Sequence, residues 1–164
     1  MRTGLFGVVS KQGASVSGAS LVAEGTWNCA LGCDPPSHRV QRAVLRCQAP
    51  WLCGMHGVWL NGPASEWDDE RHAEAVLETL SSSTAFAGVD GPVQGCSWND
   101  STHTLLLHAD FARQHPLFWH AHPEGLLFAF SVDRLVSMMR ECGLAVEPNP
   151  EGAAMLLTYG SILG

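Results

Sequence analysis

The sequence predicts an α+β protein whose strands form antiparallel sheet within a single domain, residues 1–164. The chain has 164 residues, of which 46% are hydrophobic and 15% charged, so it can bury the core of a domain of ordinary size. Short strand-like segments follow one another across turns, and the helical patterns stand apart from them. Consecutive strands joined by short turns pair antiparallel, whereas a parallel sheet requires alternating strands and helices.

The first part of the chain is predicted to contain mainly strands. Residues 4–10 are an apolar run punctuated by glycine ("GLFGVVS"), which predicts a strand. Residues 18–27 fit a helix or a strand, and we interpret them as a helix. Turn residues make 32–38 a loop ("GCDPPSH"). Apolar patterning predicts strands over 40–48 and 49–61, the second broken by glycines and ending in an Asn-Gly-Pro turn.

Residues 65–83 carry the clearest helical pattern in the chain. Ser65 or Asp68 can cap the helix, and acidic residues fill its first turn, where the helix dipole favours negative charge. Apolar residues then recur at helical spacing and form one stripe: Ala73, Val76, Leu77 and Leu80.

Two β-hairpins are predicted in the second half of the chain. Strands over 91–100 and 101–110 are expected to pair across an Asn-Asp turn. Strands over 115–122 and 125–131 are expected to pair across Pro-Glu. The strands of this half therefore belong to antiparallel sheet.

Two helices are predicted after the hairpins. Residues 132–143 form a helix that Gly143 closes, because glycine readily adopts the left-handed conformation that ends helices. Residues 150–160 form a short second helix. The order of strands, helix, hairpins and helices excludes a doubly wound parallel fold.

The composition excludes several classes of function. The net charge is −7 with histidine neutral, which disfavours a nucleic-acid binder because such proteins usually present a basic face. No apolar run approaches the length needed to span a bilayer. The first residues ("MRTGLFGVVSKQG") lack the apolar length and the cleavage site of a signal peptide. We therefore expect a cytoplasmic protein that does not enter membranes.

The six cysteines are interpreted as reduced thiols. A disulfide framework is typical of small secreted chains, which this sequence does not resemble. Cys29 and Cys33, with Cys47 and Cys53, offer four sulfur ligands for zinc, but their spacing matches no standard finger. We expect neither disulfides nor a metal site.

Histidine and tryptophan are the other side chains that suggest chemistry. His120 and His122 would lie on one face of a strand, as in a metal pair, but no third ligand can be located, so we interpret them as solvent-facing. Six tryptophans lie mostly on predicted strands, and we expect most of them in the core. Trp59 is the alternative case, because its ring could fill a pocket or stack against a peptide.

The order of several motifs resembles one known family. "LLLHAD" is followed by "FARQHPLFW" and "GLLFAFSVDRLV", while "GLFGVV", "HGVWLN" and "AEAVLETL" precede them and "LLTYGSILG" follows. This order resembles the N-terminal glutaminase-type domain of the asparagine synthetase family, a class II glutamine amidotransferase. The resemblance covers nearly the whole chain. It implies an N-terminal-nucleophile (Ntn) hydrolase fold, a four-layer αββα sandwich of two antiparallel sheets with helices outside.

The resemblance also implies where the catalytic residues would stand. The family hydrolyses glutamine with an N-terminal cysteine, whose position is occupied here by Thr3 behind Met1 and Arg2. The oxyanion asparagine is replaced by His56, while Gly57 keeps the place of the glycine that offers an amide. These departures predict a domain that does not hydrolyse glutamine.

Further positions follow from the same resemblance. His72 stands where the family binds the substrate's amino group, and Asn61 and Trp59 belong to the former substrate pocket. Asp110 and Arg113 form a structural turn between two core strands. The arginine that clamps the substrate carboxylate is not fixed by the alignment, which leaves three candidates: Arg39, Arg42 and Arg46.

Two hypotheses of different classes follow. In the first, the chain is a degenerate glutaminase-like domain that scaffolds or docks substrate for an ATP-dependent amide-forming enzyme. β-Lactam synthetases and lasso-peptide cyclases resemble this arrangement, since they keep the fold without a working glutaminase. In the second, it is an active Ntn amidohydrolase or amidotransferase that uses Thr3 after its first two residues are removed. The substrate that such a scaffold would dock is expected to be a peptide or a small-molecule carboxylate.

The expected partner is a synthetase-type domain or chain. The family's synthetase domain, with its Ser-Gly-Gly-x-Asp-Ser phosphate loop, is expected to be absent from this chain, so ATP and magnesium would belong to the partner and no cofactor to this domain. Residues 151–164 are crowded with apolar side chains. An apolar patch commonly marks an interaction site, which predicts association with the partner or, when the chain is alone, a homo-oligomer.

Overall fold

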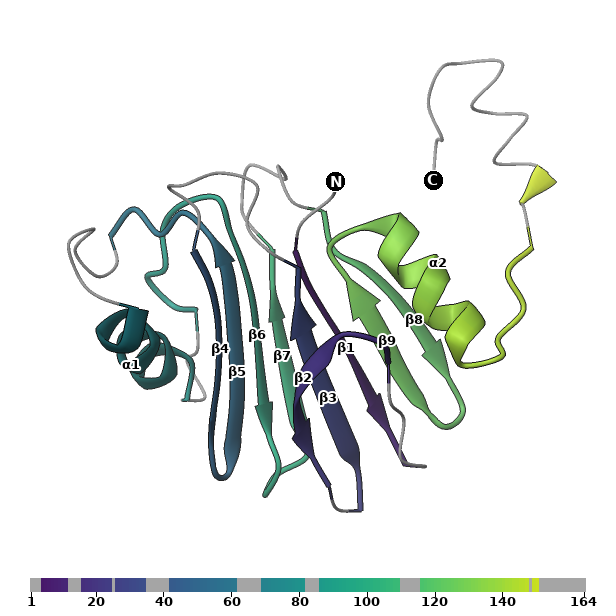
Figure 1. The fold of residues 1–164 in the computed structure, drawn as a ribbon, viewed down its shortest axis with the longest axis horizontal. Coiled ribbons are helices and arrows are strands. Elements are labelled where there is room, and N and C mark those ends of the chain that lie inside the picture. Colours follow the sequence, from purple (N-terminus) through teal and green to yellow (C-terminus); the bar gives the residue numbers. More distant parts are fainter. Residues whose placement is uncertain are drawn as a thin grey trace.

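The computed structural model describes residues 4–11, 16–24, 26–34, 42–61, 69–81, 86–109, 116–147 and 149–150. These residues form nine strands and two helices (Figure 1). The strands are β1 (Leu5–Ser10), β2 (Ala19–Ala23), β3 (Asn28–Cys33), β4 (Arg42–Gln48), β5 (Trp51–Gly57), β6 (Val93–Asn99), β7 (Thr104–His108), β8 (Phe118–His122) and β9 (Gly125–Ala129). The helices are α1 (Asp69–Leu80) and α2 (Val132–Glu141).

The strands form two antiparallel sheets. One has five strands in the order β2-β3-β1-β9-β8, and the other has four in the order β4-β5-β6-β7. In the four-stranded sheet every neighbour in space is also a neighbour along the described strands, so it is a simple meander. In the five-stranded sheet β1 is the central strand, because it pairs with β3 on one side and with β9 on the other. The predicted α+β class with antiparallel sheet is confirmed.

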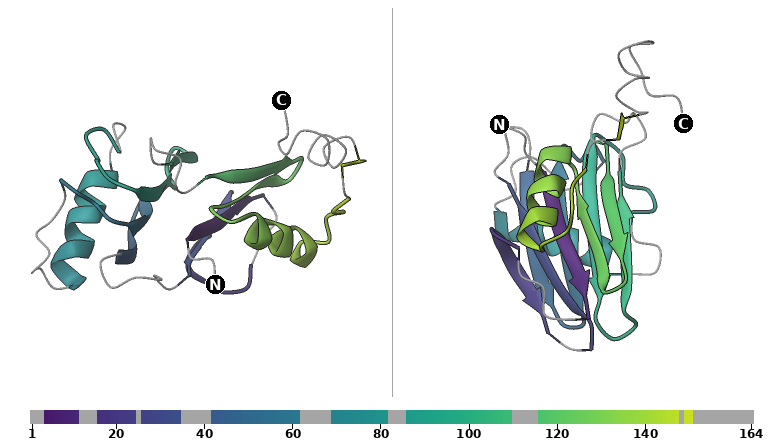
Figure 2. Two further views of the ribbon diagram at one scale, coloured as in Figure 1. Left: turned by 90° about the horizontal axis from the view of Figure 1, so that it is seen from above. Right: turned by 90° about the vertical axis from the view of Figure 1, so that its right-hand side faces the viewer.

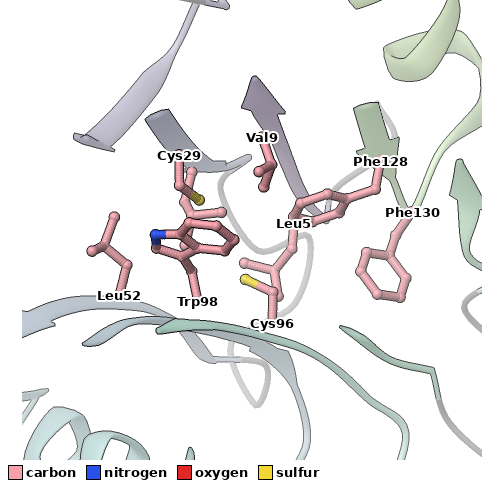
Figure 3. Packing of buried hydrophobic residues seen from close by; sticks show 9 residues of the cluster. Leu5, Val9, Cys29, Leu52, Cys96, Trp98, Phe128 and Phe130 are labelled. Carbon is pink, nitrogen blue, oxygen red and sulfur yellow. The ribbon is translucent and has the colours of Figure 1, made fainter. Parts of the chain in front are cut away.

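The two sheets share one core. Alternate residues of a strand point to opposite faces of its sheet, and each sheet turns an apolar face toward the other. Figure 3 shows Trp98, Cys96 and Leu52 of the four-stranded sheet pointing toward Val9 and Leu5 of the five-stranded sheet. The remaining buried members of the cluster are Cys29, Leu31, Phe128 and Phe130.

Each helix packs against the opposite face of one sheet. Val76 and Leu80 of α1 pack against Cys53 and Met55 of β5. These two residues alternate with Leu52 and His56 along the strand, so their side chains point to the face away from the shared core. Members of α2 pack against the five-stranded sheet in a separate cluster: Leu135 and Met138, with Phe6, Val8, Leu127 and Ala129. Figures 1 and 2 show the two helices well separated, at opposite sides of the molecule.

Most predicted elements are confirmed. Both hairpins, the four strand segments over 4–10, 40–48, 49–61 and 91–100, and the helices within 65–83 and 132–143 contain the observed elements. Gly143 adopts a positive φ of 70° after α2, and its N–H donates to the carbonyl of Arg140, so the predicted C-terminal closure is present. The capping residues Ser65 and Asp68, and the helix expected over 150–160 apart from its first residue, lie outside the described residues.

Two predictions in the first part of the chain are wrong. Residues 18–27 are not a helix, because β2 lies within them and pairs with β3. The loop expected over 32–38 begins too early, because β3 extends to Cys33. When a segment fits both a helix and a strand pattern, its conformation depends on the partners available in the fold. Here the segment forms a strand because it can pair with the edge of β3. The strand β3 itself was not predicted.

Candidate functional site

The start of β1 is held by a buried polar contact between the two sheets. The backbone N–H of Leu5 donates to Oε1 of Gln94 on β6, at 2.9 Å. The Gln94 side chain is fully buried, with 0% of its surface exposed. A side chain added at Gly4 would place its Cβ 2.7 Å from the same oxygen, so the backbone at residue 4 also lies against Gln94. The backbone at the start of β1 therefore lies directly against the Gln94 side-chain amide.

His56 lies beside Gln94 in the four-stranded sheet. The two residues are directly opposite each other in the pairing of β5 with β6, so their side chains lie on the same face. That face is turned toward β1, because Gln94 reaches the Leu5 N–H across it. The His56 side chain is 0% exposed. A buried imidazole and a buried amide thus stand where β1 begins.

Gly57 ends β5 in a conformation that only glycine adopts easily. Its φ is 130°, and a Cβ at this position would lie 2.2 Å from the carbonyl oxygen of Pro92. The next residue continues this contact, since the N–H of Val58 donates to the Pro92 carbonyl at 3.2 Å. The glycine therefore lets the segment after β5 run close to the segment before β6.

Asn61 joins these same two segments. Its Oδ1 accepts from the indole Nε1–H of Trp59 and from the N–H of Asp90, each at 2.8 Å. Its Nδ2 donates to the carbonyl of Gly88. The Leu60 N–H donates to the Asp90 carbonyl at 2.7 Å. The side chain of Asn61 is thus a clamp between two loops.

His72 belongs to the same end of the molecule but to a different layer. Its ring meets the Trp59 ring edge-on, with the centroids 6.4 Å apart and the planes at 88°. His72 is buried on α1, and α1 packs on the face of the four-stranded sheet opposite to the one that bears His56. The structure therefore brings Trp59, Asn61 and His72 together and separates them from His56 by a sheet.

Several predicted site residues lie outside the described part of the chain. These are Thr3, the turn residues Asp110 and Arg113, and Arg39. Of the other two arginines considered as clamps, both lie on β4, and Arg46 is exposed. One cavity on the described surface lies between α1 and the strands β4 and β5, and another lies near Val9 and Trp98; none of the described residues predicted for the substrate site lines either of them.

The chain matches no protein-family model, no curated protein and no solved structure. What the site can do is therefore inferred from its own geometry.

The cysteines offer no activated thiol. All six are described, and none is in a disulfide. Burial, and to a smaller extent the nearby carboxylates Asp100 and Asp34 respectively, raises the pKa of the Cys29 and Cys33 thiols from 9.0 to about 12. Burial also raises the pKa of Cys96 well above its ordinary value. A nucleophilic cysteine requires the opposite shift, because the thiolate is the reactive form.

Metal-binding groups are equally sparse. Within the described residues no cluster of three or more histidine, cysteine or acidic side chains is placed to hold an ion. The His120 and His122 rings do lie on one face of β8, stacked with centroids 6.3 Å apart. Neither described helix has the length and apolar character needed to cross a membrane.

The tryptophans depart from the prediction that most are core residues. Among the five in the described residues only Trp98 is fully buried, and Trp119 is 63% exposed. The other three, Trp27, Trp51 and Trp59, are half-buried. Trp27 and Trp59 lie outside the strands, Trp51 is the first residue of β5, and Trp119 lies on the edge strand β8, so none of these four rings is covered on all sides.

Gln94 is the site residue that the sequence analysis missed. It stands in the apolar strand segment "GPVQGCSW", where a lone glutamine at a core position signals a specific hydrogen-bond partner. The identity of that partner, the N–H of Leu5, depends on the packing of one sheet on the other.

Proposed function

We propose that this chain is a degenerate glutaminase-like domain of the Ntn-hydrolase type. Two antiparallel sheets with a shared core, each carrying a helix on its other face, support a four-layer αββα sandwich. In this proposal the domain does not hydrolyse glutamine. It scaffolds or docks substrate for an ATP-dependent amide-forming enzyme of the asparagine synthetase, β-lactam synthetase or lasso-cyclase kind.

The observation that carries the proposal is the buried contact at the start of β1. A glutaminase of this type needs a nucleophile directly ahead of β1 and amide donors that stabilise the tetrahedral oxyanion. Under the proposal His56 stands at the oxyanion position; its neighbour Gln94 turns its carbonyl oxygen toward the Leu5 N–H. Loss of one oxyanion donor typically lowers the rate by about 10²–10³.

The surroundings of Gly57 support the same conclusion. The glycine lies in a tight contact with the Pro92 carbonyl, which the next N–H also engages. Asn61 and Trp59, from the former substrate pocket, hydrogen-bond to each other, and Asn61 also bonds to the loop before β6. Under the proposal, polar groups that would bind a substrate instead form hydrogen bonds within the protein.

Under the proposal, the chemistry of amide formation lies outside these residues. ATP and magnesium act in a synthetase-type domain or chain, which activates a carboxylate before an amine attacks it. This domain then presents a surface on which the substrate, a peptide or a small carboxylate, is held. Residues 151–164, which we expect to contribute to this surface, lie outside the described part of the chain.

Hydrolysis is tested by measuring ammonia release from L-glutamine with the purified full chain and with Thr3→Ala. We expect both proteins to match the buffer blank. Intact mass is measured in parallel, to establish which residue is the first. Ammonia release that Thr3→Ala abolishes, from a protein whose mass begins at Thr3, would overturn the proposal in favour of an active Ntn amidohydrolase.

Docking is tested separately by capture of the tagged full chain from its native cells. We expect a partner that carries a Ser-Gly-Gly-x-Asp-Ser phosphate loop to be enriched. Light scattering of the purified chain then reports whether it self-associates in the partner's absence. A monomer that captures no ligase of this kind would contradict the scaffolding role while leaving the hydrolysis result intact.

A further inference from the structure

A cavity opens at the end of β1 that lies away from the Gln94 contact. Its volume is about 290 Å³, and Val9 lies in its lining. Val9 follows Leu5 by four residues on β1, so the cavity is roughly 13 Å from the buried contact at Gln94, at about 3.3 Å of rise per residue. The two places are therefore separate, and a ligand bound in this cavity would not depend on the proposed function.

Two indole rings form much of this cavity. Trp98 is 1% exposed and belongs to the shared core, so it makes a fixed floor. Its Nε1–H donates to Oδ1 of Asp100 at 3.3 Å, which fixes the ring orientation. Trp27 is half-buried and forms a side wall, packed against the same core. The half-buried Trp27 ring leaves a surface on which a flat aromatic ligand can stack.

The polar side chains among the lining residues are two imidazoles. His103 stacks on Trp98, with centroids 6.1 Å apart and planes at 28°. It adopts a φ of 51°, a left-handed conformation that is uncommon outside glycine and that often occurs at functional sites. His122 enters the lining from β8, and its ring is stacked on His120. Both rings thus have a set orientation at the cavity.

Positive charge beside the cavity comes from a single ammonium group at the Trp27 wall. None of its described lining residues is acidic. The ammonium group of Lys11 lies 5.1 Å from the centre of the Trp27 ring, and Lys11 is the only lysine in the chain. Two acids are close in sequence to this end, Asp100 and Glu124. Of these, Asp100 is already hydrogen-bonded to the Trp98 indole.

We propose that this cavity binds a small planar aromatic carboxylate, with its ring against Trp27 and its carboxylate toward the imidazoles and Lys11. The volume suits a single-ring ligand, near the lower limit of typical small-molecule sites. The aliphatic side chains Leu105 and Leu126 complete an apolar lining for the ring. The imidazole N–H groups and the ammonium group supply donors for the carboxylate.

The probe is sodium benzoate, added to the ¹⁵N-labelled full chain while the tryptophan indole N–H signals are followed by NMR. We expect saturable shifts of the Trp27 and Trp98 signals, assigned by single Trp→Phe variants, and no shift of Trp119. Benzylamine tests the charge and cyclohexanecarboxylate tests the ring, and both should bind at least about tenfold more weakly, a difference of about 1.4 kcal/mol.

Matched variants test the residues. Trp27→Ala should weaken benzoate binding by about tenfold, and Trp119→Ala should leave it unchanged. Lys11→Met should weaken it by about two- to fivefold, whereas Arg140→Met should not. His103→Gly removes the imidazole at a backbone conformation that glycine accepts, so the fold is retained and binding falls.

Three outcomes would overturn the proposal. The first is the absence of a saturable response to benzoate in the Trp27 and Trp98 signals. The second is benzylamine binding as tightly as benzoate, which would show that the cavity does not select an anion. The third is a response to benzoate that survives in Trp27→Ala and His103→Gly variants whose spectra show a native fold.

Discussion

The two ends of β1 lie in one core, but one end is filled by polar side chains and the other borders a cavity. At the Leu5 end, a buried glutamine from the facing sheet satisfies the backbone N–H, and a buried imidazole lies next to it. At the Val9 end, the sheets leave a cavity of about 290 Å³ between aromatic walls. The first end is filled by the protein's own polar groups, and the second offers its side chains to a ligand.

This difference has a physical origin in the side chains that meet there. A buried N–H without a partner is unfavourable, so the Leu5 end needs a long polar side chain, and Gln94 fits it. At the Val9 end the facing residue is Trp98, whose ring already has Asp100 as its partner. Rigid rings cannot fold into the remaining space, so the space stays open.

The largest expected effect comes from the floor of the open end. Trp98→Ala should lower the free energy of unfolding by about 3–5 kcal/mol, because it removes a fully buried ring from the shared core. Trp119→Ala, at a ring that is 63% exposed, is the matched control and should change it by less than about 1 kcal/mol. Urea unfolding measures both.

The relative size of these effects tests the comparison. If Trp98→Ala proved no more destabilising than Trp119→Ala, the Trp98 ring would not be a rigid part of the core. The cavity at the Val9 end would then lack a fixed floor.

A smaller effect is expected at the closed end. Gln94→Leu should lower the free energy of unfolding by about 1–3 kcal/mol, because the buried N–H of Leu5 loses its acceptor. Gln48→Leu, at an exposed position on β4, should stay within about 0.5 kcal/mol. The measurement is again urea unfolding, with hydrogen exchange of the Leu5 amide as a local readout. Slow exchange of that amide in Gln94→Leu would show that another group closes this end.

The smallest effect concerns thiol ionisation at the open end, where Cys29 pairs with Val9. Its pKa is raised by burial from 9.0 to about 12 in the folded protein, so the thiol stabilises the fold fully below pH 9.0 and this contribution is lost as the pH rises through about 12. Between about pH 8 and about pH 10, Cys29 should account for about 1 kcal/mol of lost stability.

Variants isolate this pH dependence. In Cys29→Ala the fall in unfolding free energy across the same pH range should be shallower than in the parent. Equal slopes in both proteins would mean that the Cys29 thiol ionises freely, and that the open end admits water to the core.

Local sequence patterns determined most of the elements. The apolar run in "THTLLLH" and the turn "SWNDST" predict the β6–β7 hairpin, because both signals act between neighbouring residues. The stripe of α1 and the glycine after α2 are signals of the same short range. None of these predictions required knowledge of a distant part of the chain.

The candidate site was only partly within reach of the sequence. The family resemblance pointed to His56, Gly57 and Asn61, and the structure describes all three near the ends of β5 and β6 or the loops beside them. It did not point to Gln94, and it grouped His56 with His72, which a sheet separates. Alignment supplies positions along the chain, whereas the face on which a side chain lies depends on register.

The sequence by itself determined the α+β class, the hairpins and the two helices. Only the tertiary structure decided that residues 19–23 are a strand, since that segment gains its hydrogen bonds from β3. Tertiary structure also decided that Gln94 serves Leu5, 89 residues away, and that Trp27, Trp98, His103 and His122 surround one cavity. Such contacts depend on how two sheets pack, and no local pattern encodes the partner across that interface.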